Sequence, residues 1–222
     1  MARGLLSRKR QSPGVDPVAI AIGLLCLAFA LLIHEFAHAW MAYQLGDPTA
    51  KYDGRLTLNP LVHFEPMGAI ALTLTYIMSK GTLIMGWAKP VPINSDNFKS
   101  RSLDTALVAA AGPFINFAFA IPCSMLYLTG VFGGTPLEVV LVRMVMANVG
   151  FGLFNLIPWP PLDGWKILGA ALPEAMTEQM RRMEARMGIW SLVGLLVLMW
   201  LGGQKLLYVA NQTVLGFLLG VK

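Results

Sequence analysis

Long uncharged runs separated by short polar stretches dominate the pattern of this chain. Several of these runs approach the roughly 20 residues that a helix needs to cross a bilayer. They are Pro17 to Ile33 with the residues that follow, Thr105 to Gly134, Val139 to Leu162 with one charge at Arg143, Met187 to Gln204, and Leu206 to Val221, which spans the membrane or lies along its surface. The pattern predicts an all-α polytopic membrane protein with about four to six membrane helices.

The segments between these runs predict smaller elements at one membrane surface. Pro66 to Ser79 is uncharged but too short for a full span, so we expect a re-entrant segment. Glycine, proline, aspartate and asparagine with short alternating stretches in "GDPTAKYDGRLTLNP" and "KGTLIMGWAKPVPINSDNFKSR" predict small β-hairpins on the cytoplasmic side. We expect one domain over residues 1–222, with a core at 17–172 and a C-terminal amphipathic segment and helices at 173–222.

Composition supports a membrane protein and excludes a nucleic-acid partner. Hydrophobic residues make up 56% of the chain and charged residues 13%, whereas soluble domains carry about 25% charged residues. The net charge is +5, but the basic residues fall mostly between apolar runs, where membrane topology accounts for them. Cys26 and Cys123 lie in separate apolar runs without a CxxC pattern, which is typical of small buried side chains. The lipid bilayer is therefore the expected surrounding.

The N-terminus also resembles a cleaved signal peptide in form. A basic start precedes the first apolar run, and Ala37-His38-Ala39 imitates a small-x-small cleavage site. Cleavage there would cut a helical pattern that continues through "MAYQLG". The pattern therefore favours a retained membrane helix.

The stretch "LLIHEFAHAW" places three ionisable residues at the end of the first apolar run. His34 and His38 are four residues apart, so on a helix both side chains project from one face and can bind one metal ion. Neutral imidazoles suit Zn²⁺, and Glu35, about 100° away around the helix, suits a general base. The alternative is a helix that leaves the bilayer near Ile33, but "FAHAWMA" stays apolar after the motif. Ionisable groups inside an apolar span indicate a functional site.

A catalytic zinc ion usually has three protein ligands, so a further ligand must come from elsewhere. The candidates are His63, the one other histidine, and carboxylates in apolar surroundings, of which Asp163 in "NLIPWPPLDG" is the foremost. Prolines break a helix, and within a membrane a broken helix is tolerated only where its backbone faces protein or a wet cavity. The alternative is that Asp163 only caps the short helix "GWKILGAAL".

Several of these stretches resemble the site-2 protease family of intramembrane zinc metalloproteases. The similarity rests on "HEFAH", on "NLIPWPPLDG", on "AAGPFINF", and on "GWAKPVPIN" and "LNPLVHFEPMGAI", which resemble loops of the compact bacterial branch without a PDZ domain. Trp165-Lys166 departs from the small residue and arginine that are common after the Leu-Asp-Gly of the family.

The resemblance implies a zinc metalloendopeptidase that cleaves transmembrane segments of other membrane proteins. It implies one zinc ion per chain, held by His34, His38 and Asp163, with Glu35 as the general base. Asn155 would bind the scissile carbonyl or its oxyanion, and Asn116 would be a packing or polar-network residue.

The two ligand-bearing segments also predict a topology. His34 and Asp163 each lie near the C-terminal end of an apolar helix, so these helices must run in the same direction, which requires that Pro66 to Ser79 does not cross the membrane. Nine lysines and arginines then lie on the motif side against four at the N-terminus. The nine are Lys51, Arg55, Lys80, Lys89, Lys99, Arg101, Arg181, Arg182 and Arg186, and the four are Arg3, Arg8, Lys9 and Arg10. The positive-inside rule predicts a multi-pass protein of the cell inner membrane with its site toward the cytoplasm.

Other interpretations remain open at this point. A non-proteolytic zinc carrier or sensor would also bind metal, although it needs a path of ligands that the spans do not offer. A serine or aspartyl intramembrane protease is a third interpretation, but the sequence contains no Gly-x-Ser-Gly motif and no second aspartate in a membrane segment. His63 and Glu65 form a gate or transient ligand, or belong to an ordinary loop. "GWAKPVPIN" is an edge strand for an unwound substrate or a plain surface hairpin. The sequence does not predict the substrate's identity or the oligomeric state.

Overall fold

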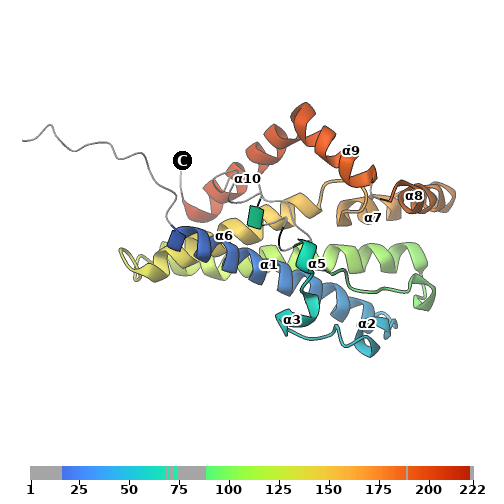
Figure 1. Ribbon diagram of the computed structural model, residues 1–222, viewed down its shortest axis with the longest axis horizontal. Coiled ribbons are helices and arrows are strands. Elements are labelled where there is room, and N and C mark those ends of the chain that lie inside the picture. Colours follow the sequence, from blue (N-terminus) through green and yellow to red (C-terminus); the bar gives the residue numbers. More distant parts are fainter. Residues whose placement is uncertain (1–16, 69, 71–72, 75–88, 189, 221–222) are drawn as a thin grey trace, which may run out of the picture.

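The computed structural model describes residues 17–68, 70, 73–74, 89–188 and 190–220. Its body consists of three long helices that lie side by side, α1 (Pro17–Gln44), α5 (Arg101–Leu128) and α6 (Pro136–Asn155) (Figure 1). Each is long and apolar enough to cross a membrane, and so is the region Trp190–Leu219. The described residues thus contain four candidate spans, as a multi-pass membrane protein requires.

The directions of the three long helices agree with the topology expected from the ligand positions. Asn116 of α5 contacts both His34 of α1 and Asn148 of α6. Further along α5, Phe119 contacts Phe29 of α1, nearer the start of that helix. Hence α1 and α5 run antiparallel. Ala120, further along α5, packs against Val145, earlier on α6, so α6 is antiparallel to α5 and parallel to α1.

The connection between α1 and α5 begins and ends at the same end of this bundle. The Asp47 carboxylate accepts hydrogen bonds from the Asn94 backbone N–H and from Asn97 Nδ2, both at 2.7 Å. Val91 packs against Ala39 and Ala50. Much of Pro66 to Ser79 lies outside the described residues, so its expected re-entrant course is not described.

The hairpin expected at residues 46–60 is wrong. This segment forms the short helix α2 (Thr49–Tyr52), turns, and the start of α3 (Pro60–His63). The physical reason is local bonding of side chains to the backbone: Asp47 accepts from the Thr49 backbone N–H at 3.1 Å, and the N-cap residue Asn59 accepts from the Leu61 backbone N–H at 3.1 Å. Both contacts begin a helical turn where alternation had suggested a strand.

The hairpin expected at residues 80–101 falls partly outside the described residues, at positions 80–88. Its described remainder contains the 3₁₀ turn η1 (Ser95–Asn97) and then enters α5. No strand occurs in the described parts of the chain. All regular secondary structure among the described residues is therefore helical, without the small β elements.

The C-terminal part forms a bent arm on the bundle. It comprises α7 (Asp163–Ala170), the amphipathic helix α8 (Glu174–Met187), α9 (Trp190–Leu198), the π-helical turn η2 (Met199–Gly203) and α10 (Gln204–Leu219). Gly202 has φ +130°, and there the chain turns sharply between α9 and α10 (Figure 1). α10 packs on α5 and α6, where Leu215 joins a core with Ala120, Val145 and Val149. The two C-terminal runs thus form one bent unit.

Candidate metal centre

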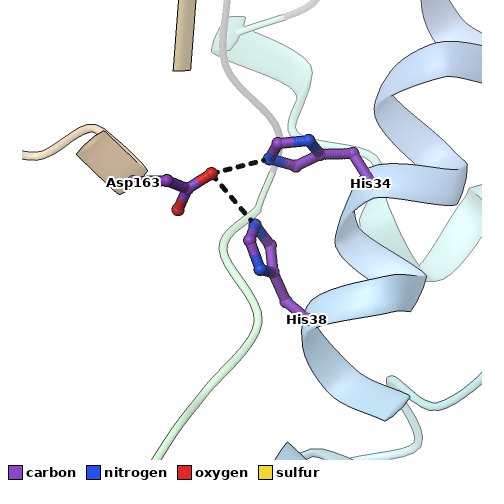
Figure 2. A group of neighbouring side chains, drawn as sticks. All are labelled: His34, His38 and Asp163. Atoms are coloured by element: carbon purple, nitrogen blue, oxygen red, sulfur yellow. Dashed lines mark ion pairs between the residues drawn. The ribbon is translucent and has the colours of Figure 1, made fainter. Parts of the chain in front are cut away.

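Three buried side chains converge between α1 and the start of α7. His34 Nε2 lies 3.1 Å and His38 Nε2 lies 3.3 Å from Asp163 Oδ2 (Figure 2). The side chains come from one face of α1, four residues apart, and from the first residue of α7. Their exposed fractions are 2%, 7% and 6%. The structure therefore brings together the three residues that were expected to be metal ligands.

The opposite ring nitrogens of both histidines are engaged by acceptors. His34 Nδ1 lies 2.8 Å from Asn116 Oδ1, and His38 Nδ1 lies 2.8 Å from the Val108 carbonyl oxygen. Each Nδ1 therefore carries the hydrogen and donates it, which leaves the lone pair of each Nε2 directed at Asp163. This is the tautomer that binds a metal through Nε2.

A bound cation would offset the electrostatic repulsion among the three ligand atoms. Two nitrogen lone pairs and one carboxylate oxygen repel one another when nothing positive lies between them. Asp163 Oδ2 is buried and has no hydrogen-bond partner among the described residues, which is costly for a carboxylate. The three candidate ligand atoms lie within 4.8 Å of one another. The donor set of two imidazoles and one carboxylate fits Zn²⁺ and leaves a coordination position for water.

Two glycines create the space that this convergence needs. A Cβ atom on Gly112 of α5 would lie 2.6 Å from His34 Cε1 and 2.6 Å from His38 Cε1 and Nε2. A Cβ atom on Gly164 would lie 2.2 Å from the Leu156 carbonyl oxygen. Since real Cβ atoms do not approach so closely, Gly112 admits both imidazoles, and Gly164 lets α7 start directly against the end of α6.

The two residues expected to act in catalysis lie on α1, which carries the histidines, and at the end of α6. Glu35 is half-buried and follows His34 on α1. Asn155 is the last residue of α6, is half-buried, and donates from Nδ2 to the Phe151 carbonyl oxygen at 3.0 Å. Among the described residues, no hydrogen bond or ion pair joins either side chain to the three ligands. Phe151 borders the site, because its ring centroid lies 4.8 Å from that of His34.

His63 and Glu65 stand apart from this group. His63 is buried at the end of α3, and its Nε2 donates to the Thr57 carbonyl oxygen at 3.1 Å. Glu65 accepts a hydrogen bond from the Met67 backbone N–H at 3.3 Å. These contacts link both side chains to residues of their own loop.

Sequence reasoning missed two residues of the surroundings. Gly112 was noted only as part of "AAGPFINF", and nothing in a single sequence shows which glycine faces a ring. Asn148 was not singled out, although it is a polar residue within an apolar run, which in a membrane helix is a usable signal. Asn116 was expected in a polar network, and it binds His34 directly.

Comparison with known proteins identifies relatives of this chain. Residues 133–201 match peptidase family M50, a range that includes Asn155 and Asp163. A Bacillus subtilis (strain 168) protein named "Putative zinc metalloprotease YwhC" is 36% identical over 170 residues, covering 73% of this chain and 74% of the relative. The Mycobacterium tuberculosis (strain H37Rv) protein named "Putative zinc metalloprotease Rip2" is 32% identical over 197 residues, covering 83% of this chain and 70% of the relative. No solved structure matches the chain.

Proposed function

The chain belongs to peptidase family M50, the site-2 protease family, and from this premise we propose that it hydrolyses peptide bonds in or near transmembrane segments of other membrane proteins. As a member of this family it is a membrane metalloprotease with zinc as its cofactor. The observation that carries the proposal is the convergence of His34 Nε2, His38 Nε2 and Asp163 Oδ2, buried within a bundle of apolar helices. A protease whose site lies there meets substrates that are themselves in the bilayer.

We assign the steps of hydrolysis to an HExxH-type site. Zinc bound by His34, His38 and Asp163 supplies Lewis acidity, which makes a water molecule nucleophilic at neutral pH and polarises a carbonyl group. The Glu35 carboxylate accepts the proton of the attacking water and transfers it to the leaving amine nitrogen. Asn155 Nδ2 carries two N–H groups, of which one is bonded to the Phe151 carbonyl oxygen, and the other donates to the developing oxyanion.

A helical substrate segment must unwind before its peptide bond can react, because helical hydrogen bonds occupy its carbonyl groups. The stretch "GWAKPVPIN", residues 86–94, suits β-addition, in which the unwound substrate segment pairs with it as an additional strand. Their described part, 89–94, lies outside the helices and is attached to the bundle by Val91 and by the bond from the Asn94 N–H to Asp47. Residues 86–88 lie outside the described part of the chain.

The same proposal includes the orientation in the cell's inner membrane. Basic residues gather at the end of the bundle that carries the metal ligands: Lys51 on α2, Arg101 at the start of α5, and Arg181, Arg182 and Arg186 on α8. The loop of residues 129–135 at the other end carries no lysine or arginine. By the positive-inside rule this distribution favours a site toward the cytoplasm.

The test of function is the variant Glu35→Gln, assayed with a purified single-span model substrate. Loss of the general base should lower cleavage by about 10²–10⁴-fold, while the zinc content stays at the wild-type level. Glu138→Gln, at the opposite end of the bundle, is the matched control and should cleave normally. Wild-type protein that binds zinc but cleaves no membrane substrate would instead support the zinc carrier or sensor. Full cleavage by Glu35→Gln would refute the assigned role.

A further inference from the structure

A line of buried hydrogen bonds leads from the metal ligand His34 across α5 to α6. His34 Nδ1 donates to Asn116 Oδ1 at 2.8 Å, and Asn116 Nδ2 donates to Asn148 Oδ1 at 2.9 Å. Asn148 Nδ2 in turn donates to the Met144 carbonyl oxygen at 2.9 Å. Both asparagines are 0% exposed. Buried amides in an apolar helix bundle are rare enough to need a reason.

The last acceptor determines the direction of every bond in this line. A backbone carbonyl can only accept, so the Asn148 amide must turn its NH₂ group toward Met144 and its oxygen toward Asn116. The Asn116 NH₂ group then donates to Asn148 Oδ1 and, at 2.9 Å, to the Ala30 carbonyl oxygen. With both donors used, Asn116 presents its oxygen to His34, which must place its hydrogen on Nδ1.

The two histidines differ in how their tautomer is determined. His38 Nδ1 faces the Val108 backbone carbonyl, which cannot present a donor. His34 Nδ1 faces a side-chain amide, which could rotate by half a turn and present its NH₂ group instead. Such a rotation would move the hydrogen of His34 to Nε2, the atom that faces Asp163, and would remove the lone pair needed for a metal. His34 therefore depends on whatever prevents the rotation of Asn116.

We propose that Asn148 is a positioning residue for the metal ligand His34, acting through Asn116. Its oxygen holds one Asn116 N–H, and the Ala30 carbonyl holds the other, so rotation of Asn116 would bring two pairs of acceptors face to face. Removing the Asn148 oxygen leaves one of these two restraints and an unsatisfied buried N–H. This inference rests on the proposed metal site. Replacing Asn148 should change the affinity for zinc, because Asn148 acts on the ligand His34 and not on the substrate.

The decisive measurement is zinc affinity by competition with a chelator, on full-length protein in detergent. Loss of a direct hydrogen-bond partner of a metal-bound histidine weakens binding about 10–100-fold, and Asn148 is one bond further away, so Asn148→Leu should weaken zinc binding about 3–10-fold. Asn148→Ser should do the same, because its hydroxyl bonds its own helix and does not reach Asn116. The serine variant keeps the test available if the leucine variant does not fold.

A conservative variant separates positioning from packing. In apolar surroundings the carboxyl group of Asn148→Asp stays protonated, so its carbonyl can accept from Asn116 while its hydroxyl donates to Met144. This variant should bind zinc within about twofold of wild type. Asn211→Leu is the matched control, because Asn211 is an asparagine of α10 that faces Gly150 on α6 and takes no part in this line. It should bind zinc normally.

The stabilisation produced by zinc gives a second readout. A ligand raises the unfolding temperature according to its affinity for the folded state, so weaker zinc binding reduces the rise seen when zinc is added. A purely structural role of Asn148 would lower the unfolding temperature of the metal-free and zinc-loaded protein equally. If both Asn148→Leu and Asn148→Ser bind zinc with wild-type affinity, the role of Asn148 is overturned but the proposed metal site is not. Absence of zinc binding in the wild type would overturn the metal site itself.

Discussion

At the scale of single residues, Gly112 shows how an absent side chain can shape a site. It belongs to α5 but lies against the rings of His34 and His38, which come from α1. The HExxH spacing places the two rings on one face of a helix, and Gly112 provides the room in which they can turn toward Asp163. Nothing in the spacing itself indicates where that room comes from.

Gly112→Ala should therefore weaken zinc binding without unfolding the protein. The added methyl group would lie 2.6 Å from both imidazoles, which must move away from Asp163, and we expect at least a tenfold loss of zinc affinity. Alanine in place of a helical glycine favours the helix by roughly 0.5–1 kcal/mol, so α5 itself should persist. Zinc stoichiometry measures the loss of binding, and circular dichroism measures whether the helices persist.

Gly150→Ala serves as the control for that substitution. The nearest atom to its added methyl group is Asn211 Oδ1 at 3.9 Å, an ordinary contact. Zinc binding should be unchanged in this variant. Normal zinc affinity in Gly112→Ala would show that the two rings do not need the space assigned to them.

At the scale of elements, Asp47 joins the end of α1 to the segment before α5. Its carboxylate is 0% exposed and accepts from the Thr49 N–H, the Asn94 N–H and Asn97 Nδ2. Burial by itself would raise the pKa of Asp47, but the hydrogen bonds from Thr49, Asn97 and Asn94 outweigh burial and lower the pKa. These contacts replace the hairpin that alternation predicted, because one buried carboxylate satisfies several backbone donors at once.

The Asp47 carboxylate should make stability dependent on pH. Since its pKa is lower in the folded state, its contribution is present above the unfolded pKa of about 3.9 and is lost as the pH falls through the folded pKa. Asp47→Asn should unfold more easily at pH 7, by about 1–3 kcal/mol, and lose less stability on acidification. Thermal unfolding at pH 7 and near pH 3 measures both effects.

Asp96→Asn is the control for this prediction. Asp96 forms an exposed ion pair with Arg101 at 3.2 Å, and such pairs contribute about 0–1 kcal/mol. An equal loss of stability in the two variants would contradict the role of Asp47 as the connector. A clear difference would show that the buried contacts of Asp47 matter.

At the scale of the whole molecule, the helix directions place the ligands and most basic residues at one end. α1 and α6 run toward that end, and α5 starts there, so the connection of residues 45–100 makes no net crossing. In the C-terminal arm, the turn at Gly202 separates α9 from α10, and the Trp159 indole donates from Nε1 to the Ser191 carbonyl oxygen at 2.9 Å. This long-range hydrogen bond holds the start of α9 beside the segment that follows α6.

The cytoplasmic orientation can be tested with single cysteines in a chain whose Cys26 and Cys123 are replaced by alanine. Lys99→Cys lies at the ligand end, and Val131→Cys lies in the loop after α5, where Val131 is 74% exposed. In intact cells a membrane-impermeant maleimide should label Val131→Cys, and it should label Lys99→Cys only after permeabilisation. The opposite labelling pattern would reverse the proposed orientation, because both positions report on the same helix.

The sequence by itself determined the apolar spans, the pairing of His34 with His38 and the candidacy of Asp163. Length, composition and helical spacing are local properties, so they can be read without knowing any neighbour. Only the tertiary structure decided that Asp163 meets both histidines, that Gly112 makes room for them, and that Asn116 and Asn148 orient His34. The physical reason is that each of these contacts joins helices distant in sequence, and packing rather than periodicity decides which of their faces meet.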